Sequence, residues 1–163
     1  MQLYLMRHGE AEPELTNEKR PLSETGRNDI QRVAAFVRAN IAVKVDTVFH
    51  SGKTRARETA EIIFSAVTSS MLMQIDKHLS PNADPEIWKD RLVGERENLM
   101  LVGHLPHLNR LGALLVCADA LQTVVNFSTG TLVCLESHDS ESWVVRWVIT
   151  PEFLKRQMMG HAG

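Results

Sequence analysis

The strongest constraint on the fold is an alternation of short apolar runs with longer amphipathic segments over the first 116 residues. Short apolar runs predict buried strands, and the run at 99–102 (Leu-Met-Leu-Val) is apolar on both faces, as in the centre of a parallel sheet. The predicted strands are 3–6, 47–49, 72–75 and 99–102. Strands that alternate with helices predict a three-layer α/β/α sandwich with a mostly parallel central sheet.

Apolar residues recur at helical spacing in the segments that follow these runs. Helices are predicted after Ser23, from about Lys53, after Asp84 and over 106–116. Ser23 and Asp84 are residue types that cap helix N-termini, and Pro85 fits the first position of the third helix. Each helix therefore has a start signal or a clear apolar face.

The last third of the chain has a different pattern. Thr131 to Glu136 and Trp143 to Ile149 predict two strands joined as an antiparallel hairpin. Trp143 and Trp147 lie four apart, so a regular strand would place both on one face of the sheet, packed in the core. No linker or repeat interrupts the sequence, which predicts one domain over 1–163.

The composition is that of an ordinary globular protein, with 44% hydrophobic and 23% charged residues. A net charge of −2 argues against a nucleic-acid or anionic-membrane partner, and no apolar run approaches the roughly 18 residues that span a bilayer. The N-terminal sequence does not resemble a secretion signal. Cys117 and Cys134 lie in apolar stretches, where we expect buried free thiols, so the expected location is the cytoplasm.

Unusual polar residues follow three of the predicted strands. The first strand ends in Arg7-His8-Gly9, the fourth is followed by His104, and Arg55 lies one turn into the helix after the second. The carboxyl ends of parallel strands meet at one edge of a sheet, where ligands bind. Arginine forks match phosphate oxygens, so two histidines and two arginines at this edge predict a site for a phosphoryl group.

Four segments in order resemble the motifs of the histidine phosphatase superfamily, which shares the phosphoglycerate mutase-like fold. They are Arg7-His8-Gly9-Glu10, Leu22-Ser23-Glu24-Thr25-Gly26, the segment 51–60 (SGKTRARETA) and Val102-Gly103-His104. Together they cover the chain to about residue 110. The segments 20–22 and 103–106 are most similar to SixA-type phosphohistidine phosphatases.

The resemblance implies a role for each of these residues. His8 would be the nucleophile that forms a phosphohistidine intermediate. Arg7 and Arg55 would hold the phosphoryl oxygens, and a protonated His104 would stabilise the charge of the transferring group.

Three further residues also have expected roles near the site. Gly9 would let the backbone approach the phosphate closely, because it has no side chain. Arg20 would reach the rim of the phosphate site, with a solvated loop arginine as an equally good alternative. Glu10 follows the nucleophile and is a possible proton donor.

The sequence departs from larger members of the superfamily, which carry a glutamate general acid in an L-x-E context. Here that stretch reads Leu79-Ser80-Pro81, and the next carboxylates are Asp84, which fits a helix cap better than catalysis, and Glu86. An alkoxide, whose pKa lies far above about 10, leaves slowly without an acid, whereas imidazole, with a pKa of about 6.5, needs one much less. The missing acid therefore favours a phosphoramidate substrate.

The resemblance thus implies a phosphohistidine phosphatase that acts on a protein, without a cofactor or a metal. A phosphatase for a small phosphomonoester and a non-catalytic phosphohistidine-binding adaptor are the alternatives, and the four core residues argue against the adaptor. His104 and His107 do not suggest a metal pair, because Pro106 lies between them and no cluster of further ligands accompanies them. The remaining histidines are expected at the surface or in loops: His50, His78, His138 and His161.

Overall fold

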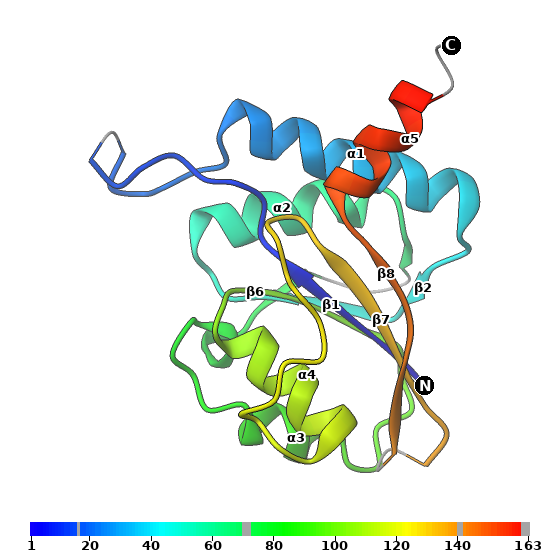
Figure 1. Cartoon of the computed structure of the whole chain (residues 1–163). Coiled ribbons are helices and arrows are strands. Elements are labelled where there is room, and N and C mark those ends of the chain that lie inside the picture. The colour runs from blue at the N-terminus through cyan, green and yellow to red at the C-terminus, as the bar shows by residue number, and fades with distance from the viewer. Residues whose placement is uncertain (16, 70–72, 140–141, 161–163) are drawn as a thin grey trace.

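The computed structural model describes residues 1–15, 17–69, 73–139 and 142–160. A six-stranded sheet runs through its centre in the order β5-β3-β6-β1-β7-β8, and β2 pairs with β4 in a small separate sheet (Figure 1). The strands are β1 (Gln2–Arg7), β2 (Lys44–Val45), β3 (Thr47–His50), β4 (Thr68–Ser69), β5 (Met73–Ile75), β6 (Leu99–Gly103), β7 (Leu132–Ser137) and β8 (Trp143–Ile149). Leu72, the first residue of the third predicted strand, lies outside the described residues.

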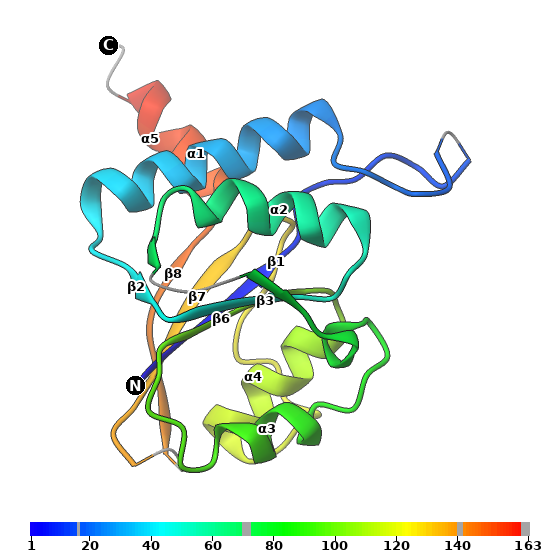
Figure 2. The same ribbon diagram turned by 180° about the vertical axis from the view of Figure 1, so that it is seen from behind.

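Helices cover both faces of the sheet (Figures 1 and 2). On one face lie α1 (Glu24–Asn40), α2 (Thr54–Phe64) and α5 (Pro151–Gly160), and on the other lie α3 (Glu86–Leu92) and α4 (His107–Cys117). A short 3₁₀ turn, η1 (Lys77–Leu79), precedes α3. The predicted three-layer sandwich is confirmed. Among the described residues, none of the helices is long and apolar enough to cross a membrane.

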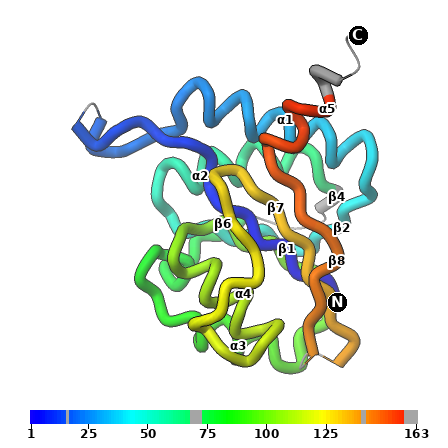
Figure 3. The backbone as a smooth tube through the Cα atoms, viewed as in Figure 1, coloured from blue at the N-terminus to red at the C-terminus, as the bar shows by residue number. Residues whose placement is uncertain are grey.

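The directions of the strands also follow the prediction. β5, β3, β6 and β1 are parallel neighbours, while β7 is antiparallel to both β1 and β8. The tube in Figure 3 shows β1 running beside β6 and β7. In the β1–β6 pair, Arg7 lies opposite Gly103, so both strands end together at the same edge of the sheet.

The core divides into two layers because side chains alternate along each strand. Leu3 and Leu5 of β1 face α3 and α4, whereas Tyr4 and Met6 face α1, α2 and α5. All four are almost fully buried. The sheet is therefore held rigidly between two apolar layers, which fixes the positions of the strand ends.

The helix starts were predicted to within one residue. The Ser23 Oγ accepts a hydrogen bond from the Gly26 amide at 3.0 Å, which confirms the cap of α1. α3 begins at Glu86, one residue later than expected, with Pro85 at the N-cap position. Asp84 still satisfies an amide of the first turn, since its Oδ1 accepts from the Glu86 N–H at 3.1 Å.

The prediction that Trp143 and Trp147 share a face is wrong. A register shift between Cys134 and Leu135 places an extra residue in β8, so Trp147 pairs with Cys134 and Val145 pairs with Leu135. A β-bulge of this kind changes the face on which the following side chains lie. Trp143 consequently packs in the α3–α4 layer and Trp147 against the opposite layer, beside Tyr4.

Two expectations about burial were also wrong. Cys117 ends α4 and is exposed, whereas Cys134 in β7 is buried; both thiols are free. His50 is buried rather than at the surface, because it ends β3 between β5 and β6. His138 is exposed and His78 is half-buried, while His161 lies outside the described residues.

Candidate active site

The ends of β1 and β6 and the start of α2 bring His8, His104 and Arg55 together. The His8 amide donates to the Gly103 carbonyl at 3.1 Å, which continues the β1–β6 pairing by one residue. The two imidazole rings then lie 4.8 Å apart between centroids, at an angle of 52°. From the first turn of α2, the Arg55 Nε donates to the His8 Nε2 at 3.2 Å.

The hydrogen bonds of His8 define its tautomer. Its Nδ1 lies 2.6 Å from the Gly9 carbonyl oxygen, which can only accept, so Nδ1 carries the hydrogen. Nε2 is therefore unprotonated, and its lone pair accepts the hydrogen bond from Arg55. A neutral imidazole with an unprotonated nitrogen between cationic groups is the form that a nucleophile requires.

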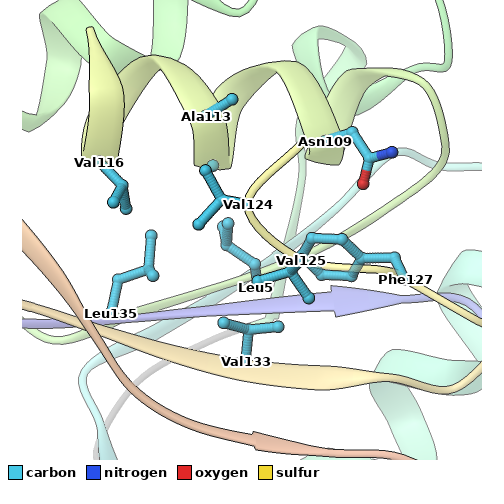
Figure 4. A pocket seen from close by; sticks show the side chains of 10 residues that line it. Leu5, Asn109, Ala113, Val116, Val124, Val125, Phe127, Val133 and Leu135 are labelled. Atoms are coloured by element: carbon cyan, nitrogen blue, oxygen red, sulfur yellow. The ribbon is translucent and has the colours of Figure 1, made fainter. Parts of the chain in front are cut away.

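Arg7 is anchored by the segment that leads into β7. Its Nη1 donates to the Phe127 carbonyl at 2.6 Å, and its Nε is buried without a hydrogen-bond partner among the described residues. The Phe127 side chain lines an apolar pocket between α4 and the sheet, together with Leu5 and Val133 (Figure 4). Packing of this aromatic ring thus holds the carbonyl that orients the guanidinium, whose pKa is lowered by burial.

Both histidines are neutral in the free site. Burial lowers the pKa of His8 to about 4, and the cations Arg55, Arg7 and Arg20 act in the same direction. Burial also lowers the pKa of His104 to about 2, with further lowering by His8 and Arg55. The expectation of a protonated His104 is therefore wrong for this state, because an imidazolium there would be desolvated among positive charges.

Ser51 contacts His104. Ser51 is the first residue of the segment 51–60 that resembles a superfamily motif, but the sequence analysis did not predict this contact. The Ser51 Oγ lies 2.6 Å from the His104 Nε2, and both side chains are buried. The other ring nitrogen, Nδ1, is buried without a hydrogen-bond partner in the described part of the chain. Ser51 directly follows β3, so it lies at the same edge of the sheet as His8 and His104.

The structure gives Gly9 a packing role that the sequence analysis did not predict. Its amide already donates to the Thr59 Oγ1 at 3.0 Å. A Cβ at this position would lie 2.9 Å from side-chain carbons of both Leu22 and Ile30 and 3.1 Å from the Gly26 carbonyl oxygen. The glycine is thus required for close packing of the loop on α1, and its amide is committed to α2 rather than to a ligand.

Arg20 lies in the loop between β1 and α1, and its charge acts on the site. Its backbone has a positive φ of 47°, unusual for a residue other than glycine, and its Nε donates to the Glu12 carbonyl at 3.3 Å. The positive charge of Arg20 lowers the pKa of both His8 and Arg55. This arrangement agrees with a position at the rim and disfavours the solvated-loop alternative.

Glu10 is tied to the start of α1. Its Oε1 accepts from the Ser23 Oγ at 2.8 Å, and its carbonyl oxygen accepts from the Ser23 amide at 3.0 Å. In the described part of the chain, the side-chain charges that shift the pKa of His8 or His104 belong to arginine, lysine and histidine. The geometry therefore favours a structural role for Glu10 over proton donation.

Comparison with known proteins agrees with this geometry. The model of the histidine phosphatase superfamily (branch 1) matches residues 3–80, which include Arg7, His8 and Arg55. No curated protein sequence matches the chain.

Solved structures extend the similarity to almost the whole chain. The protein histidine phosphatase SixA complexed with tungstate is 21% identical, with a TM-score of 0.81 over 94% of this chain and 99% of that one. The α-ribazole phosphatase from Shigella flexneri is 16% identical, with a TM-score of 0.70 over 93% of this chain and 97% of that one. Phosphoserine phosphatase from Entamoeba histolytica, in complex with 3-phosphoglyceric acid, is 15% identical, with a TM-score of 0.66 over 94% of this chain and 98% of that one. The chain is thus similar to the histidine phosphatase superfamily over residues 3–80, just under half of its length, and shares the fold of these phosphatases over almost all of it.

Proposed function

We propose that this enzyme is a phosphohistidine phosphatase that removes the phosphoryl group from a histidine of a protein. The observation that carries the proposal is the His8 Nε2 lone pair, which lies beside Arg55 in a site where the charges acting on His8 are cationic. A dianionic phosphoryl group would be attracted to such a site and placed within reach of the nucleophile.

The reaction has two steps. The His8 Nε2 attacks phosphorus of a phosphohistidine whose other ring nitrogen carries a hydrogen. The bond between phosphorus and the substrate imidazole breaks, and the electron pair stays on that nitrogen, so the substrate ring leaves as neutral imidazole. Water then attacks the phosphorus of phospho-His8, which releases inorganic phosphate and restores the neutral imidazole. Arg7 and Arg55 would hold the phosphoryl oxygens in both steps, since a guanidinium fork matches their geometry.

The carboxylates near the site support a substrate whose leaving group needs no strong acid. Glu10 is bonded to Ser23, and Asp84 accepts the Glu86 amide at the start of α3. A phosphohistidine protonated on its other ring nitrogen releases neutral imidazole, whose conjugate acid has a pKa of about 6.5, so the enzyme need not protonate the leaving nitrogen as it must protonate an alkoxide. The similarity to SixA supports the same choice, whereas the similarity to phosphatases named for ribazole and phosphoserine supports the small-phosphomonoester alternative.

Two further expectations belong to this proposal. We propose that residues 1–163 act as a single domain that recognises the phosphorylated protein directly, without a cofactor, a metal, a nucleic acid or a membrane. The free thiols of Cys117 and Cys134 support a reducing compartment, so the proposed location is the cytoplasm.

The test compares substrates at equal enzyme concentration. A histidine-phosphorylated protein, p-nitrophenyl phosphate and an alkyl phosphate are hydrolysed by the wild type and by His8→Ala, and phosphate release is measured. The proposal predicts rates that fall in that order, all dependent on His8. Faster turnover of the alkyl phosphate would favour the small-phosphomonoester alternative, and binding of the phosphoprotein without any turnover would favour an adaptor.

A further inference from the structure

Ser51 and His104 form a buried side-chain pair at the edge of the site. The Ser51 Oγ lies 2.6 Å from the His104 Nε2, and the side chains are 7% and 2% exposed. At this distance the hydrogen bond is short and shielded from water, so its direction decides which nitrogen of the imidazole carries hydrogen.

The surroundings of Ser51 indicate the direction of this hydrogen bond. The Lys53 amide donates to the Ser51 Oγ at 3.4 Å, so the hydroxyl oxygen already acts as an acceptor toward the start of α2. Its own hydrogen is then free to point to the His104 Nε2. An acceptor role for Nε2 places the single hydrogen of the neutral imidazole on Nδ1.

The unpartnered Nδ1 supports the same direction. It is buried and has no hydrogen-bond partner among the described residues, while the His104 ring lies 4.8 Å from the His8 ring. The oxygens of a transferring phosphoryl group can only accept hydrogen bonds. A lone pair on Nδ1 would therefore repel the phosphoryl group, whereas an Nδ1–H would bind it.

We propose that Ser51 is a positioning residue that fixes His104 as the neutral Nδ1–H tautomer, so that Nδ1–H donates a hydrogen bond to the transferring phosphoryl group. The inference rests on the proposed function for the identity of the acceptor. It replaces a protonated His104 with a neutral donor, and leaves the arginines to supply the positive charge. Without Ser51, the His104 imidazole can carry its hydrogen on Nε2, and Nδ1 then has no hydrogen to donate to the phosphoryl group.

The direct test is nitrogen NMR of enzyme labelled with ¹⁵N-histidine near neutral pH, with the His104 signals assigned by their absence in His104→Gln. The wild type should show hydrogen on Nδ1 and none on Nε2 of His104. Addition of vanadate, a mimic of the transferring group, should shift the Nδ1–H proton signal. Hydrogen on Nε2, or on both nitrogens, in the free wild-type enzyme would overturn the proposal, as would an unmoved signal with vanadate bound.

Two variants add a kinetic test. Ser51→Ala should lower kcat by roughly tenfold to a hundredfold and move His104 toward the Nε2–H tautomer, as loss of a residue that orients a catalytic histidine does. Ser51→Thr keeps the hydroxyl donor and should recover both the tautomer and most of the rate. Wild-type kcat in Ser51→Ala would refute the role of the serine.

The outcomes separate this inference from the proposed function. If the tautomer, its dependence on Ser51 and the vanadate shift are all observed but phosphohistidine is not hydrolysed, the proposed substrate is wrong and the assignment to Ser51 stands. If phosphohistidine is hydrolysed by an enzyme whose His104 carries hydrogen on Nε2, the assignment fails and the function stands.

Discussion

Arg55 donates a hydrogen bond from its Nε to the unprotonated Nε2 of His8 at 3.2 Å. The contact uses one donor of the guanidinium. Under the proposed function, Arg55 would therefore orient the nucleophile through Nε and hold the phosphoryl group through its terminal nitrogens. Both functions depend on the shape of the guanidinium as well as on its charge.

Replacement of Arg55 by lysine tests this dual role. Arg55→Lys keeps the positive charge but loses the planar fork and the Nε donor, so kcat/KM should fall by at least roughly tenfold. Steady-state kinetics and vanadate inhibition measure the effect. Arg57→Lys is the matched control, because Arg57 is on the same helix and pairs with Glu61 at the surface. Equal kinetics in the two variants would show that Arg55 does not touch the reacting group.

Acid should destabilise the folded protein through its buried histidines. Burial lowers the pKa of both His8 and His107 to about 4 in the folded state, while the unfolded chain titrates near pH 6.5. Above about pH 6.5 both states are neutral and the effect is absent. Below it only the unfolded state binds protons, so each such histidine lowers the free energy of unfolding by about 1.4 kcal/mol per pH unit, until the pKa of the folded state is reached.

His107 isolates one part of this effect, because it is fully buried and neither ring nitrogen has a hydrogen-bond partner in the described part of the chain. His107→Leu should lose less stability than the wild type between about pH 7 and pH 5, measured by urea unfolding. His138→Gln, at an exposed position, should follow the wild-type curve. An unchanged pH dependence in His107→Leu would mean that His107 is charged in the folded protein.

The packing of the loop after β1 on α1 should be the part of the fold least tolerant of an added methyl group. A Cβ on Gly26 would lie 2.0 Å from the Glu10 carbonyl oxygen, and a backbone atom cannot move aside cheaply. Gly26→Ala should therefore lower the free energy of unfolding by about 3 kcal/mol or more. Denaturant unfolding of the purified variant measures the loss.

Gly112→Ala is the matched control within α4. Its Cβ would lie 3.7 Å from Leu5, an ordinary contact, and would enter the apolar pocket shown in Figure 4. The substitution should stabilise the protein by about 1 kcal/mol, because alanine is the better helix former. A similar loss in both variants would contradict the steric account of Gly26.

Several features of the fold and the site could be predicted from local sequence. The apolar runs and the cap at Ser23 predict the strands and α1. Residues that follow strand ends indicate His8 and His104, and the first turn of the helix after β3 indicates Arg55. The bulge in β8 could not be predicted, because register depends on pairing with β7 and separates Trp143 from Trp147. The contact of Ser51 was missed because it depends on a distant partner, and the packing role of Gly9 was missed because its neighbours come from distant segments.

The carboxylates near the site should contribute little to turnover of phosphohistidine. Asp84→Asn keeps an oxygen for the Glu86 amide and Glu10→Gln keeps one for Ser23, so each should change the rate less than about threefold. The measurement is a plot of log rate against the pKa of the leaving group for wild type and both variants. A flat wild-type plot that becomes steep in either variant would identify a working general acid there.

His8 should carry the phosphoryl group during turnover. The enzyme is mixed with a ³²P-phosphohistidine protein, quenched in alkali within one turnover, and digested for peptide mapping. The account predicts acid-labile, alkali-stable ³²P on the Nε2 of His8, and in His8→Ala no label at this position and a rate lower by at least roughly 10³-fold. Label on His104 instead, or near-full activity in His8→Ala, would contradict it.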